Sequence, residues 1–291
     1  MGSSYDVLAP AYRALWEPVL APSARGLLDR CDQVVARLAA TPSGDAPTLV
    51  DVGTGAGVVA VDAVRRWSHV HVHATDPSAA MLDAARARAT SELSRSELDR
   101  LTFSQAPADR LPFSDGSVDM VLSSFVYQLV PDRVAALREA YRVLKPGGWI
   151  GFVTWVVDRA PFPPADAFDD ALDAFDIAEP VGDGDTVSGD YASARAAVAQ
   201  LRRVGFARVR AEAARLEHRW DVDSYLATQE RLWEAELMAS LDPNVRERLL
   251  ADARERLSRL DADAFRWHPP IVYVLGTRSA TGRRPLRWRR R

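Results

Sequence analysis

The chain has 291 residues, of which 47% are hydrophobic and 26% charged, a composition typical of a globular protein of one large domain or two small ones. No run of eighteen apolar residues occurs, and the N-terminus lacks a basic stretch followed by an apolar one, so we expect neither a transmembrane helix nor a secretory signal. The single cysteine, Cys31, excludes an internal disulfide and fits a cytoplasmic location.

The net charge of −3 hides an uneven distribution. Residues 283–291 contain six arginines, and subtracting their charge from −3 leaves −9 for residues 1–282. An acidic body disfavours broad nucleic-acid binding, and we expect no DNA partner. We expect the basic tail, residues 279–291, to be a solvated extension, with RNA and anionic lipid as the alternative partners.

Helical spacing dominates residues 1–44. Tyr5 and Tyr12 fall on one face of a first helix, and residues 25–40 carry the pattern of a second helix after Pro22. Aromatic side chains so early in the chain suggest a helical cap over a ligand cleft. The alternative is that they only pack these helices onto the domain.

A glycine-rich turn follows a short apolar strand in the sequence Leu-Val-Asp-Val-Gly-Thr-Gly-Ala-Gly, residues 49–57. Gly53 and Gly55 would let the backbone pass close to a ligand. The helix that begins at Val58 offers free N–H groups and a partial positive charge, which favour an anionic or hydroxyl-rich ligand. A dinucleotide fingerprint needs its third glycine at 58, whereas this chain places it at Gly57.

The second strand is predicted over residues 69–75, where histidine recurs at every second position. Three imidazoles on one strand face could hold a metal, but they rarely converge on one ion, and we expect no metal site. The strand ends at Asp76, 19 residues after Gly57. This spacing matches the acid that accepts hydrogen bonds from ribose hydroxyls beside a glycine-rich turn.

Two regions carry a resemblance to a known family. Asp51-x-Gly53-x-Gly55-x-Gly57 resembles the first motif of the class I S-adenosylmethionine-dependent methyltransferases. Residues 106–126 resemble the loop and fourth strand of the ubiquinone/menaquinone-type branch of small-molecule methyltransferases, and the similarity spans about residues 45–156.

The resemblance implies an α/β fold with a doubly wound, mostly parallel, seven-stranded sheet of the Rossmann-like methyltransferase type. The expected organisation is a helical cap, a cofactor-binding core, an insertion or lid, the rest of the fold with a helical pair at 221–261, and a basic tail. These parts correspond to residues 1–44, 45–156, 157–190, 191–278 and 279–291.

The resemblance also implies S-adenosylmethionine as the cofactor. Asp51 would brace the glycine turn and the methionine amino group, Asp76 would hold the ribose, and Met81 would lie against the adenine. In the similar branch an acid precedes the Leu-Pro-Phe of the loop and reaches the adenine. Here Ala106-Pro107-Ala108 stands instead, so either Asp109 or the backbone at Ala108 would take that part. The full predicted cofactor set is Asp51, Gly53, Thr54, Gly55, Gly57, Asp76, Pro77, Met81, Ala108, Asp109 and Ser124.

Methyl transfer from a sulfonium needs alignment and exclusion of water more than a fixed catalytic constellation, and the sequence indicates no catalytic residue. His218 and His268 are candidate proton acceptors, each with a packing role as the alternative. Aromatic neighbours favour the sulfonium cation. We therefore predict a small, partly apolar organic acceptor. Its predicted contacts are Tyr12, Phe125, Gln128 and Trp155. The alternatives are a nicotinamide-dependent oxidoreductase and a cofactor-binding protein without turnover.

Overall fold

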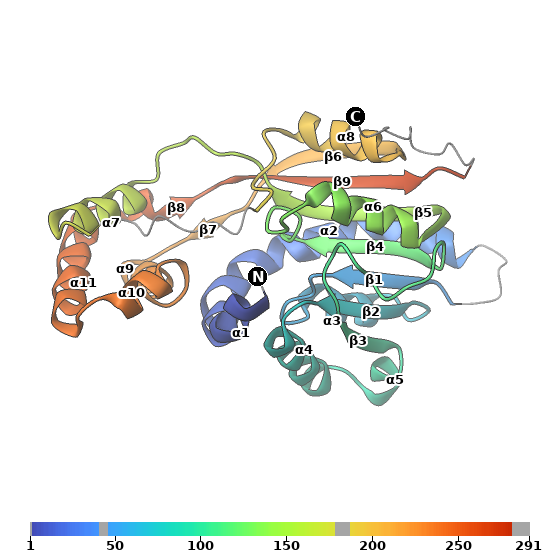
Figure 1. Ribbon diagram of the computed structural model, residues 1–291, viewed down its shortest axis with the longest axis horizontal. Coiled ribbons are helices and arrows are strands. Elements are labelled where there is room, and N and C mark those ends of the chain that lie inside the picture. The colour runs from blue at the N-terminus through green and yellow to red at the C-terminus, as the bar shows by residue number, and fades with distance from the viewer. Residues whose placement is uncertain (1, 41–45, 178–186, 281–291) are drawn as a thin grey trace, which may run out of the picture.

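A computed structural model of the chain describes residues 2–40, 46–177 and 187–280. Its centre is a seven-stranded sheet with the order β3-β2-β1-β4-β5-β9-β6 (Figure 1). Strand β9 runs antiparallel to its neighbours β5 and β6, and the other pairs are parallel, which confirms the predicted mostly parallel sheet. The strands are β1 Thr48–Val52, β2 His71–Asp76, β3 Leu101–Gln105, β4 Val118–Ser124, β5 Leu144–Trp155, β6 Phe206–Arg215 and β9 Pro270–Arg278.

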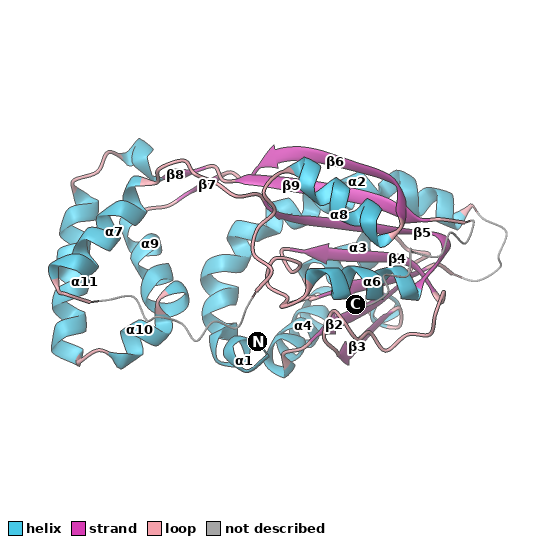
Figure 2. Cartoon of the chain, turned by 45° about the horizontal axis from the view of Figure 1, so that its top comes forward, coloured by secondary structure: helices cyan, strands magenta, loops and turns pink. Residues whose placement is uncertain are grey.

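Helices cover both faces of this sheet (Figure 2). Helices α2, α3 and α4 pack on one another, and their apolar side chains share one core cluster. Helices α6 and α8 contribute to a second cluster on the opposite face. Strands buried on both faces need continuous apolar runs, as β1 and β4 have. The bounds are α2 Glu17–Ala39, α3 Val58–Arg66, α4 Ala79–Glu92, α5 Arg95–Leu98, α6 Arg133–Val143 and α8 Ala194–Val204.

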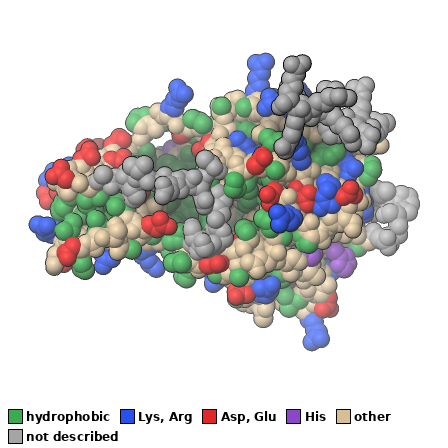
Figure 3. All heavy atoms as spheres, in the orientation of Figure 1, with side chains coloured by type: hydrophobic (Ala, Val, Ile, Leu, Met, Phe, Trp, Pro, Cys, Tyr) green, Lys and Arg blue, Asp and Glu red, His purple; other side chains and the backbone are tan. Residues whose placement is uncertain are grey.

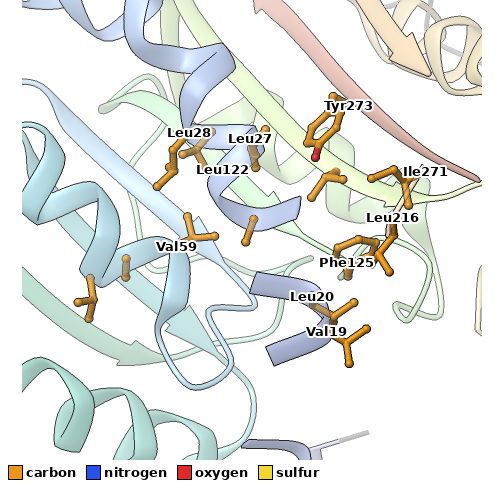
Figure 4. Close-up of a cluster of buried hydrophobic side chains, with 14 of the residues drawn as sticks. Val19, Leu20, Leu27, Leu28, Val59, Leu122, Phe125, Leu216, Ile271 and Tyr273 are labelled. Atoms are coloured by element: carbon orange, nitrogen blue, oxygen red, sulfur yellow. The ribbon is translucent and has the colours of Figure 1, made fainter. Parts of the chain in front are cut away.

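The N-terminal helices are longer than predicted. Helix α1 (Gly2–Ala11), a π-helical turn (η1, Tyr12–Trp16) and α2 follow one another directly, so the helix expected at 25–40 begins at Glu17. Pro22 lies inside α2, where it removes one backbone hydrogen bond without ending the helix. Leu27 and Leu28 of α2 point toward the sheet and are buried there, so α2 is a layer of the core (Figure 4).

A helical lobe projects from one end of the sheet (Figure 1). Beyond β6 and β9 the chain forms a short antiparallel ribbon, and this ribbon leads into a group of helices in which α7 packs against α11. The described part of the expected 157–190 lid therefore includes a helix, α7, that belongs to this lobe. The elements are β7 His218–Arg219, β8 Arg266–Trp267, α7 Pro163–Ala174, α9 Val222–Thr228, the π-helical turn η2 Gln229–Trp233, α10 Ala235–Ser240, α11 Pro243–Ser258 and the 3-10 turn η3 Ala262–Phe265.

Helix α6 begins at Arg133 and is capped by the Asp132 carboxylate, which accepts from the N–H of Ala135 at 2.9 Å. Gly276 pairs with Ile150 inside β9. Among the described residues, every helix is too short or too polar to span a bilayer.

Candidate functional site

A cavity of about 720 Å³ lies where β1, β2 and β4 end. Its floor is formed by the turns after these three strands, and its roof by α1 and η1 from the N-terminus. In the space-filling view, hydrophobic side chains line a hollow between the sheet and the helical lobe (Figure 3). Among the predicted residues, those that line the cavity are Gly53, Gly55, Asp76, Pro77, Met81, Ala108, Asp109, Ser124, Tyr12, Phe125, Gln128 and Trp155.

The structural reason for glycine differs among the three positions of the turn. All have positive φ angles, between 53° and 88°. A Cβ added at Gly53 would lie 2.4 Å from Val126, and one at Gly57 would lie 3.0 Å from the Cβ of Ala85 in α4. A Cβ at Gly55 would meet nothing nearer than Tyr12 at 3.9 Å. Packing therefore requires glycine at the first and third positions, and among the three only Gly55 has open space where a Cβ would lie.

Asp76 joins the glycine turn to the start of α4. It ends β2, is only 7% exposed and lines the cavity. One carboxylate oxygen accepts from the N–H of Gly55 and the other from the N–H of Ser78, both at 2.9 Å. Burial raises the pKa of the Asp76 carboxyl, and these two hydrogen bonds oppose the rise. A carboxylate has about four acceptor positions, so two remain for a ligand in the cavity.

Asp51 lies behind the turn in a small adjoining cavity of about 40 Å³, which Thr54 and Ser124 also line. One oxygen of Asp51 accepts from the Thr54 hydroxyl at 2.6 Å, and the other has no hydrogen-bond partner among the described residues. Burial raises the pKa of this carboxyl to about 7. A buried carboxylate oxygen without a donor fits the cationic amino group of an amino acid moiety.

The remaining predicted cofactor residues lie on two neighbouring elements. Met81 is buried at the start of α4, where Ser78 caps the helix by accepting from its N–H at 3.2 Å. Ala108 and Asp109 lie in the turn after β3, which closes with a hydrogen bond from Arg110 to Pro107. Ala108 is buried and Asp109 is exposed, while both line the cavity. Thr54 borders only the small cavity, and Gly57 lines neither of the two.

The roof of the cavity includes side chains that the sequence prediction did not assign to the site. Tyr5, Leu8 and Trp16 line the cavity beside Tyr12, and the rings of Tyr5 and Tyr12 meet edge to face at 6.2 Å. Asp6 ties this segment to α4 by accepting from the Ser78 hydroxyl. The helical spacing of the aromatic residues from Tyr5 to Trp16 predicts that they share a helix face, but it does not predict that this face meets the cavity.

The opposite end of the cavity is aromatic. Phe125 has a φ of 55° directly after β4, and its ring lies 4.4 Å from that of Trp155 at the end of β5. Gln128 donates from its side-chain amide to the carbonyl of Phe125 at 2.7 Å and accepts from the Thr154 hydroxyl at 2.7 Å. Gln128 thus holds the unusual Phe125 conformation in addition to lining the cavity.

Neither histidine proposed as a proton acceptor lines this cavity. His268 borders a second cavity, and its Nδ1 lies 2.5 Å from the Glu217 carboxylate. His218 packs edge to face on Trp220 at 4.3 Å.

His73 of β2 interacts with the hydroxyls of Thr102 and Ser104, and the described residues contain no cluster of three side chains able to hold a metal ion. The basic tail beyond residue 280 lies outside the described residues.

Comparison with known proteins identifies the core of the fold. Residues 50–152 match the family model described as a methyltransferase domain. A ubiquinone/menaquinone biosynthesis C-methyltransferase of Brucella anthropi is 42% identical over 104 residues, which cover 35% of this chain and 38% of that protein. An uncharacterized protein of Mycobacterium tuberculosis is 30% identical over 162 residues, 53% of each chain. This chain thus matches about two fifths to one half of the length of these relatives.

Solved structures share the fold over a longer stretch. A phosphoethanolamine N-methyltransferase of Haemonchus contortus, in complex with S-adenosylhomocysteine, has 19% identity and a TM-score of 0.53 and covers 89% of this chain and 52% of its own. A possible histamine N-methyltransferase of Thermotoga maritima has 18% identity and a TM-score of 0.51, and covers 96% of this chain and 99% of its own. Residues 50–152 are therefore similar to a methyltransferase domain and to relatives of the ubiquinone/menaquinone type, and the fold is that of the solved methyltransferases.

Proposed function

We propose that this chain transfers the methyl group of S-adenosylmethionine to a small, partly apolar organic acceptor. The observation that carries the proposal is the pairing of Gly55 and Asp76: an open backbone turn and a carboxylate with spare acceptor positions border the same cavity. A nucleoside with ribose hydroxyls and an amino acid moiety has the groups that such a site recognises.

Each end of the cofactor has a matching group in the chain. Asp76 would accept from the ribose hydroxyls, and Met81 and Ala108 would contact the adenine. The unpartnered oxygen of Asp51, with Thr54 and Ser124 beside it, would receive the methionine amino group. Asp109 is exposed at the rim and would lie at the adenine edge.

When bound, S-adenosylmethionine supplies an electrophilic methyl group. The bond between this methyl group and the sulfur would break as an electron pair of the acceptor forms the new bond, and S-adenosylhomocysteine would leave. The chain's part is to align the two reactants and exclude water, which is worth roughly 7–11 kcal/mol of a barrier. Tyr12, Phe125 and Trp155 line the cavity with ring surface, which favours a cationic sulfur and an apolar acceptor. Neither candidate histidine borders this cavity, so neither would take a proton from the acceptor there.

A transfer assay tests this proposal. Purified protein is incubated with methyl-labelled S-adenosylmethionine and separate quinol, phenol and amine acceptors, and the product is extracted and counted. Label is expected in at least one apolar acceptor, and at cofactor concentrations well below Kd Asp76→Ala should lower it by roughly tenfold to hundredfold. Cofactor binding without transfer to any acceptor would favour a cofactor-binding protein without turnover instead.

A further inference from the structure

A buried ion pair fixes the first residue of α2, Glu17, which is 8% exposed. Its Oε1 accepts from the guanidinium of Arg88 in α4, whereas its Oε2 has no hydrogen-bond partner among the described residues. A buried carboxylate oxygen is normally matched by a donor. An unmatched one on the wall of a cavity therefore indicates the place of a ligand's donor group.

Glu17 borders the small cavity of about 40 Å³ that Asp51 also borders. Each of the two carboxyl groups has one oxygen without a partner, and among the described residues they are the only charged side chains that line this cavity. A water molecule occupies roughly 30 Å³ in the liquid, so the cavity has room for one group of similar size, such as an ammonium. An ammonium has three N–H donors, enough to serve both oxygens.

The small cavity adjoins the first cavity at the glycine turn. Gly55 and Tyr12 border both of them. A Cβ added at Gly55 would lie 3.9 Å from the nearest atom of the Tyr12 ring, which is an ordinary van der Waals contact. The gap between the turn and the ring therefore accepts one carbon atom, so a methylene chain can lead from a nucleoside in the first cavity to an ammonium in the small one.

The charged side chains that line both cavities are acidic. The first cavity is bordered by three more carboxyl groups, those of Asp76, Asp109 and Asp132, and no lysine, arginine or histidine among the described residues lines either cavity. The turn offers an anion few donors, because the N–H groups of Thr54, Gly55 and Gly57 already donate to acceptors within the protein. A carboxylate at this end of the site would therefore face like charges without a cation to offset them.

We infer that Glu17 is a second acceptor, beside Asp51, for the ammonium of the cofactor's methionine part, and that the site selects this ammonium and not the neighbouring carboxylate. The inference rests on the proposed function, and it adds a residue from the N-terminal helices and a rule of specificity. It implies that a cofactor analogue without the carboxylate is accepted, whereas one without the ammonium is rejected.

Two analogues of S-adenosylhomocysteine with the same methylene chain test the inference. The decarboxylated analogue ends in the ammonium, and the deaminated analogue ends in the carboxylate. Their binding to the full chain is measured by isothermal titration calorimetry at about pH 8, where the Asp51 carboxyl, with a pKa of about 7, is ionised. We expect the decarboxylated analogue to bind about as tightly as S-adenosylhomocysteine. It should bind roughly tenfold to hundredfold more tightly than the deaminated analogue, the range expected for a charged hydrogen bond.

Glu17→Gln should lower this preference roughly tenfold, because it removes the charge of Glu17 from the small cavity. Arg88→Gln is the matched control. It breaks the same ion pair, but Arg88 lines neither cavity and Glu17 keeps its charge, so the preference should persist. The double variant, Glu17→Gln with Arg88→Gln, leaves neither charge buried without its partner, and it should show the lowered preference even if Glu17→Gln alone does not fold.

Equal binding of the two analogues by the wild-type chain would overturn the inference. So would a decarboxylated analogue that binds more than about tenfold more weakly than S-adenosylhomocysteine, or a preference that survives in the double variant. If Arg88→Gln loses the preference as fully as Glu17→Gln does, the ion pair is responsible and the inference is wrong. If a folded sample does not bind S-adenosylhomocysteine at all, the proposed function fails instead.

Discussion

Replacing Asp76 by alanine should lower both the stability of the fold and the affinity for the cofactor. The carboxylate holds two backbone N–H groups, of Gly55 and Ser78, at 2.9 Å each, and a buried donor that loses its acceptor costs roughly 1–3 kcal/mol. Part of this cost is offset because removing a buried carboxyl with a raised pKa also removes its desolvation penalty. We therefore expect a net loss of stability of about 1–3 kcal/mol.

Cofactor affinity should fall further, because the variant also lacks the acceptor for the ribose hydroxyls. A loss of roughly 1.4–2.8 kcal/mol corresponds to a tenfold to hundredfold weaker Kd. Asp76→Asn should lie between wild type and alanine, since one amide oxygen can serve only one of the two donors and the amide NH₂ faces the other.

The assay is calorimetric titration with S-adenosylhomocysteine, at a temperature where circular dichroism shows each variant folded. Asp83→Asn is the matched control: Asp83 lies on α4, and its exposed carboxylate pairs with Arg86 alone among the residues that the structure describes. This variant should bind S-adenosylhomocysteine like wild type and change stability by no more than about 0.5 kcal/mol. A folded Asp76→Ala that binds S-adenosylhomocysteine within twofold of wild type would refute the reasoning.

Three further predictions concern the site and the core. Gly53→Ala should destabilise the protein more than Gly147→Ala in urea unfolding, since both have positive φ but only Gly53 has a close neighbour in the Cβ direction; equal losses would contradict this. Burial raises the pKa of the Asp51 carboxyl to about 7, above its unfolded value, so the contribution of this group to stability should fall as pH rises from about 4 to 7, and Asp51→Asn should remove that contribution; a pH dependence of stability identical in wild type and Asp51→Asn would count against it. Leu27→Ala should cost about 2–5 kcal/mol in the same assay, whereas exposed Val7→Ala should cost almost nothing.

The parallel half of the sheet could be predicted because its signals are local. Strands β1 and β4 are short apolar runs, β2 alternates in hydrophobicity, and three glycines mark the turn after β1. The acid at the end of β2, Asp76, was predicted from its distance of 19 residues after Gly57. All of these features can be read from residues that are close in sequence. Two of the residues predicted in this way, Gly55 and Asp76, border the same cavity.

The helical parts could not be placed in the same way. Helix α7 has an amphipathic pattern, but the pattern does not identify its partner, which is α11, about 80 residues later in the chain. The roof residues Tyr5 and Trp16 were visible as aromatics at helical spacing, yet only the packing of α1 on α4 brings them over the cavity. The reason for Gly53 is likewise non-local, because Val126 belongs to a different strand's turn.

The central claim is that the open turn at Gly55 and the carboxylate of Asp76 together bind the nucleoside of S-adenosylmethionine. The most direct measurement is calorimetric titration of the wild-type chain with S-adenosylhomocysteine, beside a parallel titration with NADH. We predict saturable binding of S-adenosylhomocysteine at one molecule per chain and no binding of NADH. A folded sample that gives no heat with S-adenosylhomocysteine, or that binds NADH in its place, would contradict the account.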